Sequence, residues 1–130
     1  MRKIVIASGV WNLGLGALML CPALDRAIWL WLPNPFWGYL LCAFLWFTSV
    51  VLFLAARNLR ARASFVYWEA FLRYAAAILM LTIGPAQIGP WAYFVGITDA
   101  LWGLSYTFGL PCFLETTHRA LLCDEVPAAP

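Results

Sequence analysis

Two charged residues, Arg73 and Asp99, stand inside long apolar stretches of this sequence. A guanidinium offers a planar fork of donors that can bind a carboxylate, a phosphate or a quinone-like oxygen, while a nearby carboxylate balances its charge. Ionisable residues inside a membrane are costly, so they face protein or water and pair with one another. Glu69 precedes Arg73 by four residues, which places both side chains on one face of a helix. These three residues form the candidate functional cluster.

The charges of this cluster leave two interpretations open. In the first, Arg73 and a carboxylate bind a small amphiphile, or a carboxylate exchanges protons as a general acid or base. In the second, the charges form a structural ion pair or triad that fixes how the helices pack and binds nothing. One cation and two anions carry an excess negative charge. A proton, cytoplasmic water at Glu69, a ligand or a cation must therefore complete the set.

Three uncharged residues belong to the same predicted site. Asn12 either orients a ligand or hydrogen-bonds across helices, which is worth ~0.6 to 2 kcal/mol in a membrane. Trp102 and Tyr106 follow Asp99 by about one and two helical turns, and form either an aromatic wall for an apolar ligand or ordinary packing between helices. We predict no catalytic residue. The complete predicted site is Asn12, Glu69, Arg73, Asp99, Trp102 and Tyr106.

The remaining residue types exclude several familiar kinds of site. His118 is the only histidine, which excludes bis-histidine haem and histidine-based zinc or di-iron sites within one chain. The four cysteines form no Cys-x-x-C motif, and a disulfide between Cys21 and Cys42 stays open. The sequence contains no glycine-rich phosphate loop, no Ser-His-Asp set and no DNA-binding pattern. We therefore predict no metal, no cofactor and no nucleic-acid partner.

Four apolar stretches carry the candidate residues. The chain of 130 residues is 65% hydrophobic and only 11% charged, whereas about a quarter of the residues in soluble domains are charged. Crossing ~30 Å of hydrocarbon takes about 20 helical residues. The sequence predicts an integral membrane protein with one transmembrane domain over residues 1–114, and its helices are expected at about residues 4–21, 36–56, 63–83 and 91–110.

The ends of the first stretch need separate interpretation. The basic residues before it are typical of a signal peptide, but it lacks an Ala-x-Ala cleavage pattern and contains Trp11 and Asn12, so we expect it to be retained. Beyond it, we expect residues 27–32 to lie on the outer membrane surface. The prolines at 33 and 35 then turn the chain.

Basic residues predict the orientation. Counting Lys and Arg in the short loops places six on one side of the membrane, and these are Arg2, Lys3, Arg57, Arg60, Arg62 and Arg119. The other side has only Arg26. By the positive-inside rule both termini are cytoplasmic, and the short loops favour antiparallel neighbours. The expected fold is an all-α, four-helix, up-and-down bundle, with residues 115–130 forming a largely disordered cytoplasmic tail.

The polar residues of all four stretches are predicted to lie at similar depths in the membrane. With a rise of ~1.5 Å per residue from the cytoplasmic ends, they fall at about 11 to 17 Å. The residues concerned are Asn12, Thr48, Ser49, Arg73 and Asp99. Small-residue stripes around Asn12 and Asp99 mark the inward faces of their helices, because close approach drives helix association in lipid. The sequence thus predicts a single buried polar layer.

The layout and a handful of residues resemble a known group of proteins. The residues are Trp11-Asn12-x-x-x-Gly16, a proline at the outer end of that stretch, Ala56-Arg57, a basic residue in the third stretch, and Asp99. On these residues the chain resembles small bacterial four-helix membrane proteins of the DoxX-like kind. The resemblance implies a bacterial inner-membrane protein, sometimes an accessory to a respiratory or redox system. It supplies no catalytic residue.

Three functions follow as alternatives. The leading expectation is an accessory or small-amphiphile-binding membrane protein that uses the buried cluster, with a lipid or quinone as ligand. The others are a proton-coupled transporter acting as a homodimer, and an enzyme that modifies a lipid or quinone with Asp99 or Glu69 as general acid or base. A homodimer or a larger membrane complex stays open. A pocket of several hundred cubic ångströms around Arg73 favours ligand binding, whereas direct contact between Arg73 and Asp99 in a filled centre favours a structural role.

Overall fold

The computed structural model describes residues 1–20 and 35–126. All regular structure in these residues is helical, which confirms the all-α prediction for this part of the chain. The expectations for residues 27–34 lie outside the described residues. Four long helices, close to the predicted ranges, are α1 (Arg2–Met19), α3 (Pro35–Arg57), α4 (Ala63–Thr82) and α6 (Trp91–Leu114). Two short helices are α5 (Gly84–Ile88) and α7 (His118–Leu122).

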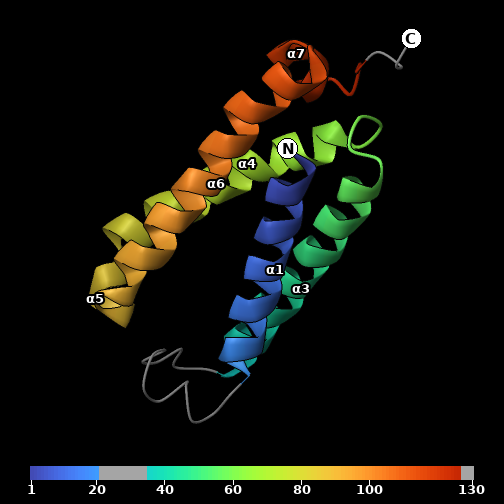
Figure 1. Ribbon diagram of the computed structural model, residues 1–130. Coiled ribbons are helices and arrows are strands. Elements are labelled where there is room, and N and C mark those ends of the chain that lie inside the picture. Colours follow the sequence, from blue (N-terminus) through green and yellow to red (C-terminus); the bar gives the residue numbers. More distant parts are fainter. Residues whose placement is uncertain (21–34, 127–130) are drawn as a thin grey trace.

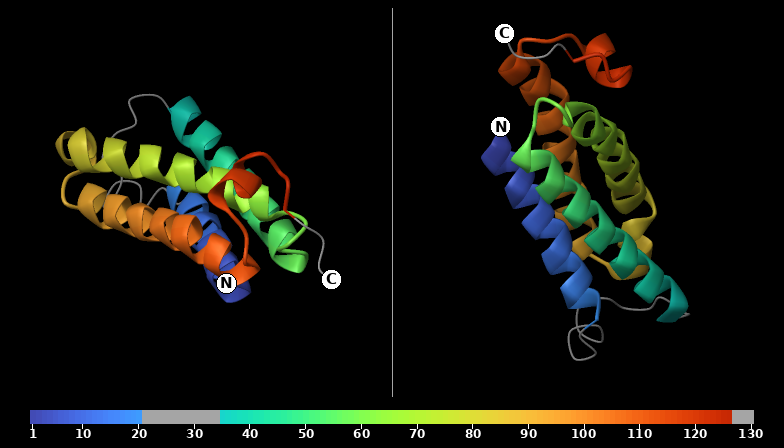
Figure 2. Two further views of the ribbon diagram at one scale, coloured as in Figure 1. Left: turned by 90° about the horizontal axis from the view of Figure 1, so that it is seen from above. Right: turned by 90° about the vertical axis from the view of Figure 1, so that its right-hand side faces the viewer.

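The four long helices form two antiparallel hairpins. α1 packs along α3, and α4 packs along α6, whereas α3 and α4 have far fewer residues in contact. Figures 1 and 2 show the two hairpins crossing and separating toward the end that carries α5. The opposite end holds the N-terminus, the loop at 58–62 and α7, and is called the charged end below. The hairpins are therefore joined mainly near the charged end.

A hydrophobic core joins the hairpins at the charged end. Each long helix contributes fully or almost fully buried side chains to it, among them Val5, Leu52, Val66, Tyr106 and Leu110. Alanines on α3 and α4, such as Ala55 and Ala70, allow the backbones to approach closely. The core ends near the middle of the helices, where the polar residues begin.

Within residues 1–20 and 35–126, two helices are long and apolar enough to cross a membrane, by length and composition. They are Gly38–Arg57 within α3 and Ala63–Thr82, which is α4. α1 and α6 do not reach the same combination of length and mean hydropathy. α1 begins with Arg2 and Lys3, and α6 contains Asp99 together with several glycines and tyrosines.

Part of the expected disordered tail is folded. Thr117 caps α7 by accepting a hydrogen bond from the backbone N–H of Ala120 at 3.2 Å. Leu121 is fully buried in the core at the charged end. Tyr67 Oη lies 2.7 Å from His118 Nδ1. Residues 115–126 thus differ from the prediction, because a short capped helix places one leucine against α4.

The last helix is longer than expected. α6 continues to Leu114 although Pro111 stands inside it. Proline cannot donate a backbone hydrogen bond, yet near the end of a helix this loss affects only the final turns. Glu115 then adopts a left-handed conformation with φ 52° that ends the helix, and Arg60 Nη2 donates to the carbonyl of Leu114 at 3.4 Å.

Candidate functional site: a polar layer beside an apolar groove

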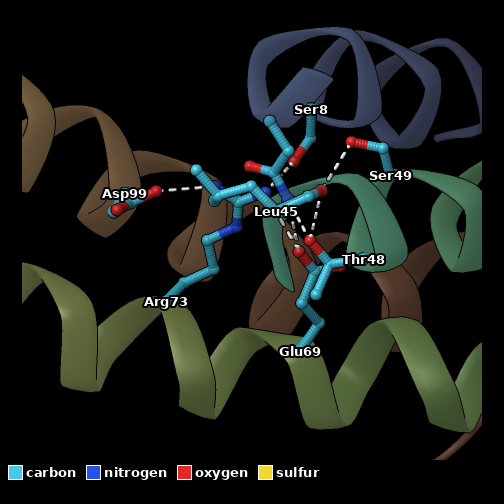
Figure 3. A network of polar contacts seen from close by, with 8 residues as sticks. Ser8, Leu45, Thr48, Ser49, Glu69, Arg73 and Asp99 are labelled. Carbon is cyan, nitrogen blue, oxygen red and sulfur yellow. Dashed lines mark hydrogen bonds and ion pairs between the residues drawn. The ribbon is translucent and has the colours of Figure 1, made fainter. Parts of the chain in front are cut away.

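Arg73 is the centre of a buried set of polar contacts between the hairpins. Its Nη1 donates to Asp99 Oδ1 at 2.6 Å, and its Nη2 donates to Glu69 Oε1 at 3.0 Å. The same Nη2 donates to Ser8 Oγ at 2.7 Å. Arg73 is 5% exposed and Asp99 6%. Figure 3 shows Arg73 reaching from α4 to Asp99 on α6 and Ser8 on α1.

Asn12 extends these contacts to α3. Its Nδ2 donates to Thr48 Oγ1 at 2.9 Å and approaches Glu69 Oε1 at 3.5 Å. Thr48 and Ser49 each donate their hydroxyl to the carbonyl of Leu45, at 2.9 and 2.8 Å, as serines and threonines in helices commonly do. We call Ser8, Asn12, Thr48, Ser49, Glu69, Arg73 and Asp99 the polar layer. Every long helix contributes to it, as the depths of these residues in the sequence predicted.

The polar layer is the main polar connection between the two hairpins. Ser8 and Asn12 belong to the first hairpin and bond to Arg73 and Glu69 of the second. Arg73 and Asp99 are in direct contact, so the centre is closed rather than open to a ligand. This arrangement favours a structural role for the ion pairs. Removing one partner of a buried ion pair strongly destabilises the folded protein, because the other charge is left without compensation.

Several buried polar atoms in this region have no hydrogen-bond partner within the described part of the chain. They are Asn12 Oδ1, Arg73 Nε and Tyr106 Oη. Unsatisfied buried groups are rare in proteins and call for an explanation. Tyr106 is fully buried, and its hydroxyl interacts electrostatically with Ser8 and with all three charged side chains of the polar layer. The layer therefore retains unused hydrogen-bonding capacity.

An apolar groove lies between α1 and α6. It has a volume of about 420 Å³, and its walls are almost entirely apolar. Its lining residues are Ala7, Val10, Trp11, Gly14, Leu15 and Leu18 on α1, and Trp91, Phe94, Val95 and Trp102 on α6. Pockets that bind small ligands have volumes of ~300 to 1,000 Å³ and mostly apolar walls. The groove has the size and character of such a pocket, but Arg73 does not line it.

Aromatic side chains shape this groove. Trp11 and Phe94 meet edge to face across it, with ring centroids 5.7 Å apart at 69°. Trp11 Nε1 and Trp102 Nε1 are buried and have no hydrogen-bond partner among the described residues. On Gly14, an added Cβ would meet no atom within 4 Å. Gly14 therefore keeps the groove wide at its α1 wall.

The structure separates the six predicted site residues into two groups. Asn12, Glu69, Arg73 and Asp99 lie together in the polar layer, and Tyr106 packs in the core beside it. Trp102 instead lines the groove. Trp102 and Tyr106 therefore do not form one wall, because Trp102 faces the groove whereas Tyr106 is fully buried in the core.

Ser8 and Trp11 were in neither the predicted site nor the predicted polar layer. Ser8 accepts a hydrogen bond from Arg73, and its place four residues before Asn12 in the small-residue stripe was the sequence signal for it. Trp11 lines the groove, and only the packing angle between the hairpins reveals that.

The cysteines play no part in either feature. Cys42 is a free, buried thiol whose Sγ donates to the carbonyl of Gly16 at 3.2 Å. Cys21, which the sequence left open as its disulfide partner, lies outside the described residues. Cys112 and Cys123 are free and exposed. Over residues 1–20 and 35–126, no group of three or more His, Cys, Asp or Glu side chains is arranged to hold a metal ion.

Comparison with known proteins gives no family for this fold and site. The DoxX-like resemblance thus stays a prediction that rests on the residues given above. The function has to be argued from the polar layer, the groove and the surface. The chain matches no protein-family model, no curated protein and no solved structure.

Proposed function

We propose that this protein is a multi-pass inner-membrane protein that binds the apolar chain of a membrane amphiphile in the groove between α1 and α6. The observation that carries the proposal is the groove itself, an apolar space of about 420 Å³ beside helices that expose apolar side chains. In a bilayer such a space is open to lipid tails. The proposal moves the ligand from the charged cluster, where the sequence suggested it, to the groove.

The surface supports placing all four long helices in the membrane. Soluble monomers rarely expose large continuous apolar patches. Here each long helix exposes large apolar side chains along its middle, including Leu13 on α1, Phe47 on α3, Ile78 on α4 and Leu101 on α6. α1 and α6 place their more polar residues, Asn12 and Asp99, inside the protein. Their lower overall hydropathy therefore does not reflect the surface they present.

Charge at the two ends supports the orientation. The N-terminus, the loop at 58–62 and α7 lie at the charged end (Figure 1). Six basic residues belong to these segments or to the helix ends beside them, namely Arg2, Lys3, Arg57, Arg60, Arg62 and Arg119. At the opposite end, α5 and its flanking turns contain no charged residue. The positive-inside rule then places the charged end, and with it both termini, in the cytoplasm.

The aromatic residues of the groove suggest how the amphiphile is held. The groove runs toward the end where α1 finishes and α6 begins, and Trp91, 45% exposed, stands at that end. Tryptophan is common at membrane interfaces, so the polar head of the amphiphile is placed near Trp91 and its chain near Gly14. An ester or quinone oxygen just below the head would supply an acceptor for the unpaired indole N–H of Trp11, which packs against Phe94 one turn from Trp91.

The orientation can be tested with cysteine labelling. In a variant whose only cysteine is Cys123, exposed after α7, we expect a membrane-impermeant maleimide to react in inverted vesicles and not in intact cells. A matched variant with Gln87→Cys as its only cysteine, in the exposed part of α5, should give the reverse pattern. Labelling of both positions from the same side would contradict the orientation.

Ligand binding can be tested by filling the groove. Because a Cβ at Gly14 meets open space, Gly14→Leu should fold and place its side chain in the groove. Native mass spectrometry from lipid nanodiscs should show a retained amphiphile on the native protein and at least a tenfold smaller retained fraction on Gly14→Leu, about 1.4 kcal/mol in binding free energy. The control is Ala17→Leu, exposed on α1 outside the groove, which should retain it. Equal retention in all three proteins would overturn the proposal.

A further inference from the structure

The polar layer contains more negative than positive charge. Within the described residues its charged members are Arg73, Glu69 and Asp99, and the other side chains facing them are the uncharged Ser8 and Asn12 of α1, Thr48 and Ser49 of α3, and Tyr106 of α6. The remaining described basic residues belong to the charged end. One uncompensated carboxylate charge inside a membrane protein is strongly unfavourable. Because the Glu69 side chain is only 9% exposed, water compensates its charge little, and one more positive charge is needed in the layer.

The two carboxyl groups are not equivalent partners of Arg73. Asp99 makes a short bond of 2.6 Å with Nη1, and that nitrogen makes no other hydrogen bond within the described part of the chain. Glu69 receives only Nη2, at 3.0 Å, and shares that nitrogen with Ser8. Its other contact, from Asn12 Nδ2, is long at 3.5 Å. Glu69 is therefore the carboxyl group whose negative charge is less well compensated.

Asn12, whose Nδ2 approaches Glu69 Oε1, also carries an unused acceptor available to a protonated Glu69. Its amide nitrogen is already used by Thr48 at 2.9 Å, while its Oδ1 is buried without a partner in the described residues. Asn12 is only 2% exposed, so water does not satisfy that oxygen from a surface. A carboxylate beside an amide oxygen repels it, whereas a carboxylic acid donates a hydrogen bond to it.

From these contacts we infer that the polar layer is a proton-binding site, with one proton held on Glu69 and directed at Asn12 Oδ1. The inference is independent of the groove and its ligand. The layer would then be neutral, with Arg73 paired to the charged Asp99 and Glu69 donating across the interface between the hairpins. Loss of the proton would place a second negative charge between α1 and α4. Proton uptake and the contact between the hairpins are therefore linked.

Infrared spectroscopy tests the inference on the intact protein. Reconstituted in vesicles of zwitterionic lipid at neutral pH, the native protein should show the carbonyl stretch of a protonated carboxyl group, and this band should shift in heavy water. Glu69→Gln, which keeps the size and hydrogen bonds of the side chain, should lose the band. The matched control Glu115→Gln, at an exposed position, should keep it.

Three results would overturn the inference. A native spectrum without the band would mean that both carboxyl groups are ionised, and this result does not depend on any variant folding. A band that survives Glu69→Gln but disappears in Asp99→Asn would place the proton on Asp99. A band that is present only without sodium, and vanishes when sodium chloride replaces choline chloride, would mean that a sodium ion, rather than a proton, is the charge that the layer normally holds.

Discussion

Replacing Arg73 with methionine is expected to lower the free energy of unfolding by about 3 to 5 kcal/mol, the cost of leaving buried charges without their partner. Arg73 is the only residue that contacts Asp99, Glu69 and Ser8 at once among the described contacts. Its loss removes the main polar connection between the hairpins. Equilibrium unfolding in mixed detergent micelles measures the effect, and Arg57→Met, exposed at the end of α3, is the control for losing an arginine.

A double variant separates lost pairing from lost packing. Since part of the damage comes from the uncompensated carboxylate, Arg73→Met combined with Asp99→Leu should recover stability relative to Arg73→Met alone. Coupling energies between contacting residues are about 0.5 to 3 kcal/mol, so a recovery within that range is expected. If the double variant is no more stable than Arg73→Met, the ion pair does not account for the effect.

The second large effect is expected from Gly96→Leu. A Cβ at Gly96 would lie 2.9 Å from Leu81 Cγ and 3.0 Å from Met80 Cβ. Both atoms are close to the backbone of the α4 segment that packs on α6, so they cannot move aside easily. Overpacking typically costs about 1 to 3 kcal/mol, and we expect the free energy of unfolding to fall by that amount as the second hairpin opens.

A second glycine gives the matched comparison. Gly14→Leu adds the same side chain on α1, where a Cβ meets no atom within 4 Å, and leucine favours a helix over glycine by up to ~1 kcal/mol. In lipid-free micelles we expect it to be neutral or slightly stabilising by the same unfolding measurement. Equal destabilisation by both variants would mean that glycine itself, rather than close packing at Gly96, is what α6 requires.

Much of the fold could be predicted because the helices are set by local features. The apolar stretches and the breaks between them gave four helices close to the observed ranges. α7 was missed because a five-residue helix has no periodic pattern of its own. Only the capping residue Thr117 and the single buried Leu121 indicate it, and the leucine is buried because α4 and α6 are already in place.

The polar layer could be anticipated more fully than the groove. The distance from the helix ends brought Asn12, Arg73 and Asp99 to one depth, and the spacing of Glu69 and Arg73 placed them on one face. The groove depends instead on how far the two hairpins separate, which is a property of packing between distant segments. Trp102 was therefore predicted beside Tyr106 rather than opposite Trp11, and Trp11 was not predicted as a site residue, although both line the groove.

The groove also changes where a ligand is proposed to bind, since the charged residues had suggested a site at Arg73. Arg73 could have been a ligand-binding residue, but its donors Nη1 and Nη2 are occupied by Asp99, Glu69 and Ser8. The polar layer therefore joins the hairpins near the middle of the long helices, next to the core at the charged end and beside the groove.

Photolabelling in the membrane tests most directly whether the groove holds an amphiphile chain. The native protein would be reconstituted with lipids that carry a diazirine in the middle of the acyl chain, and the labelled residues would be mapped by peptide mass spectrometry. We predict that labels concentrate on groove residues of both walls, such as Leu15 and Val95, well above exposed residues such as Phe47 and Phe108. Labelling that simply follows exposure, with Phe47 and Phe108 above Leu15 and Val95, would contradict the proposal.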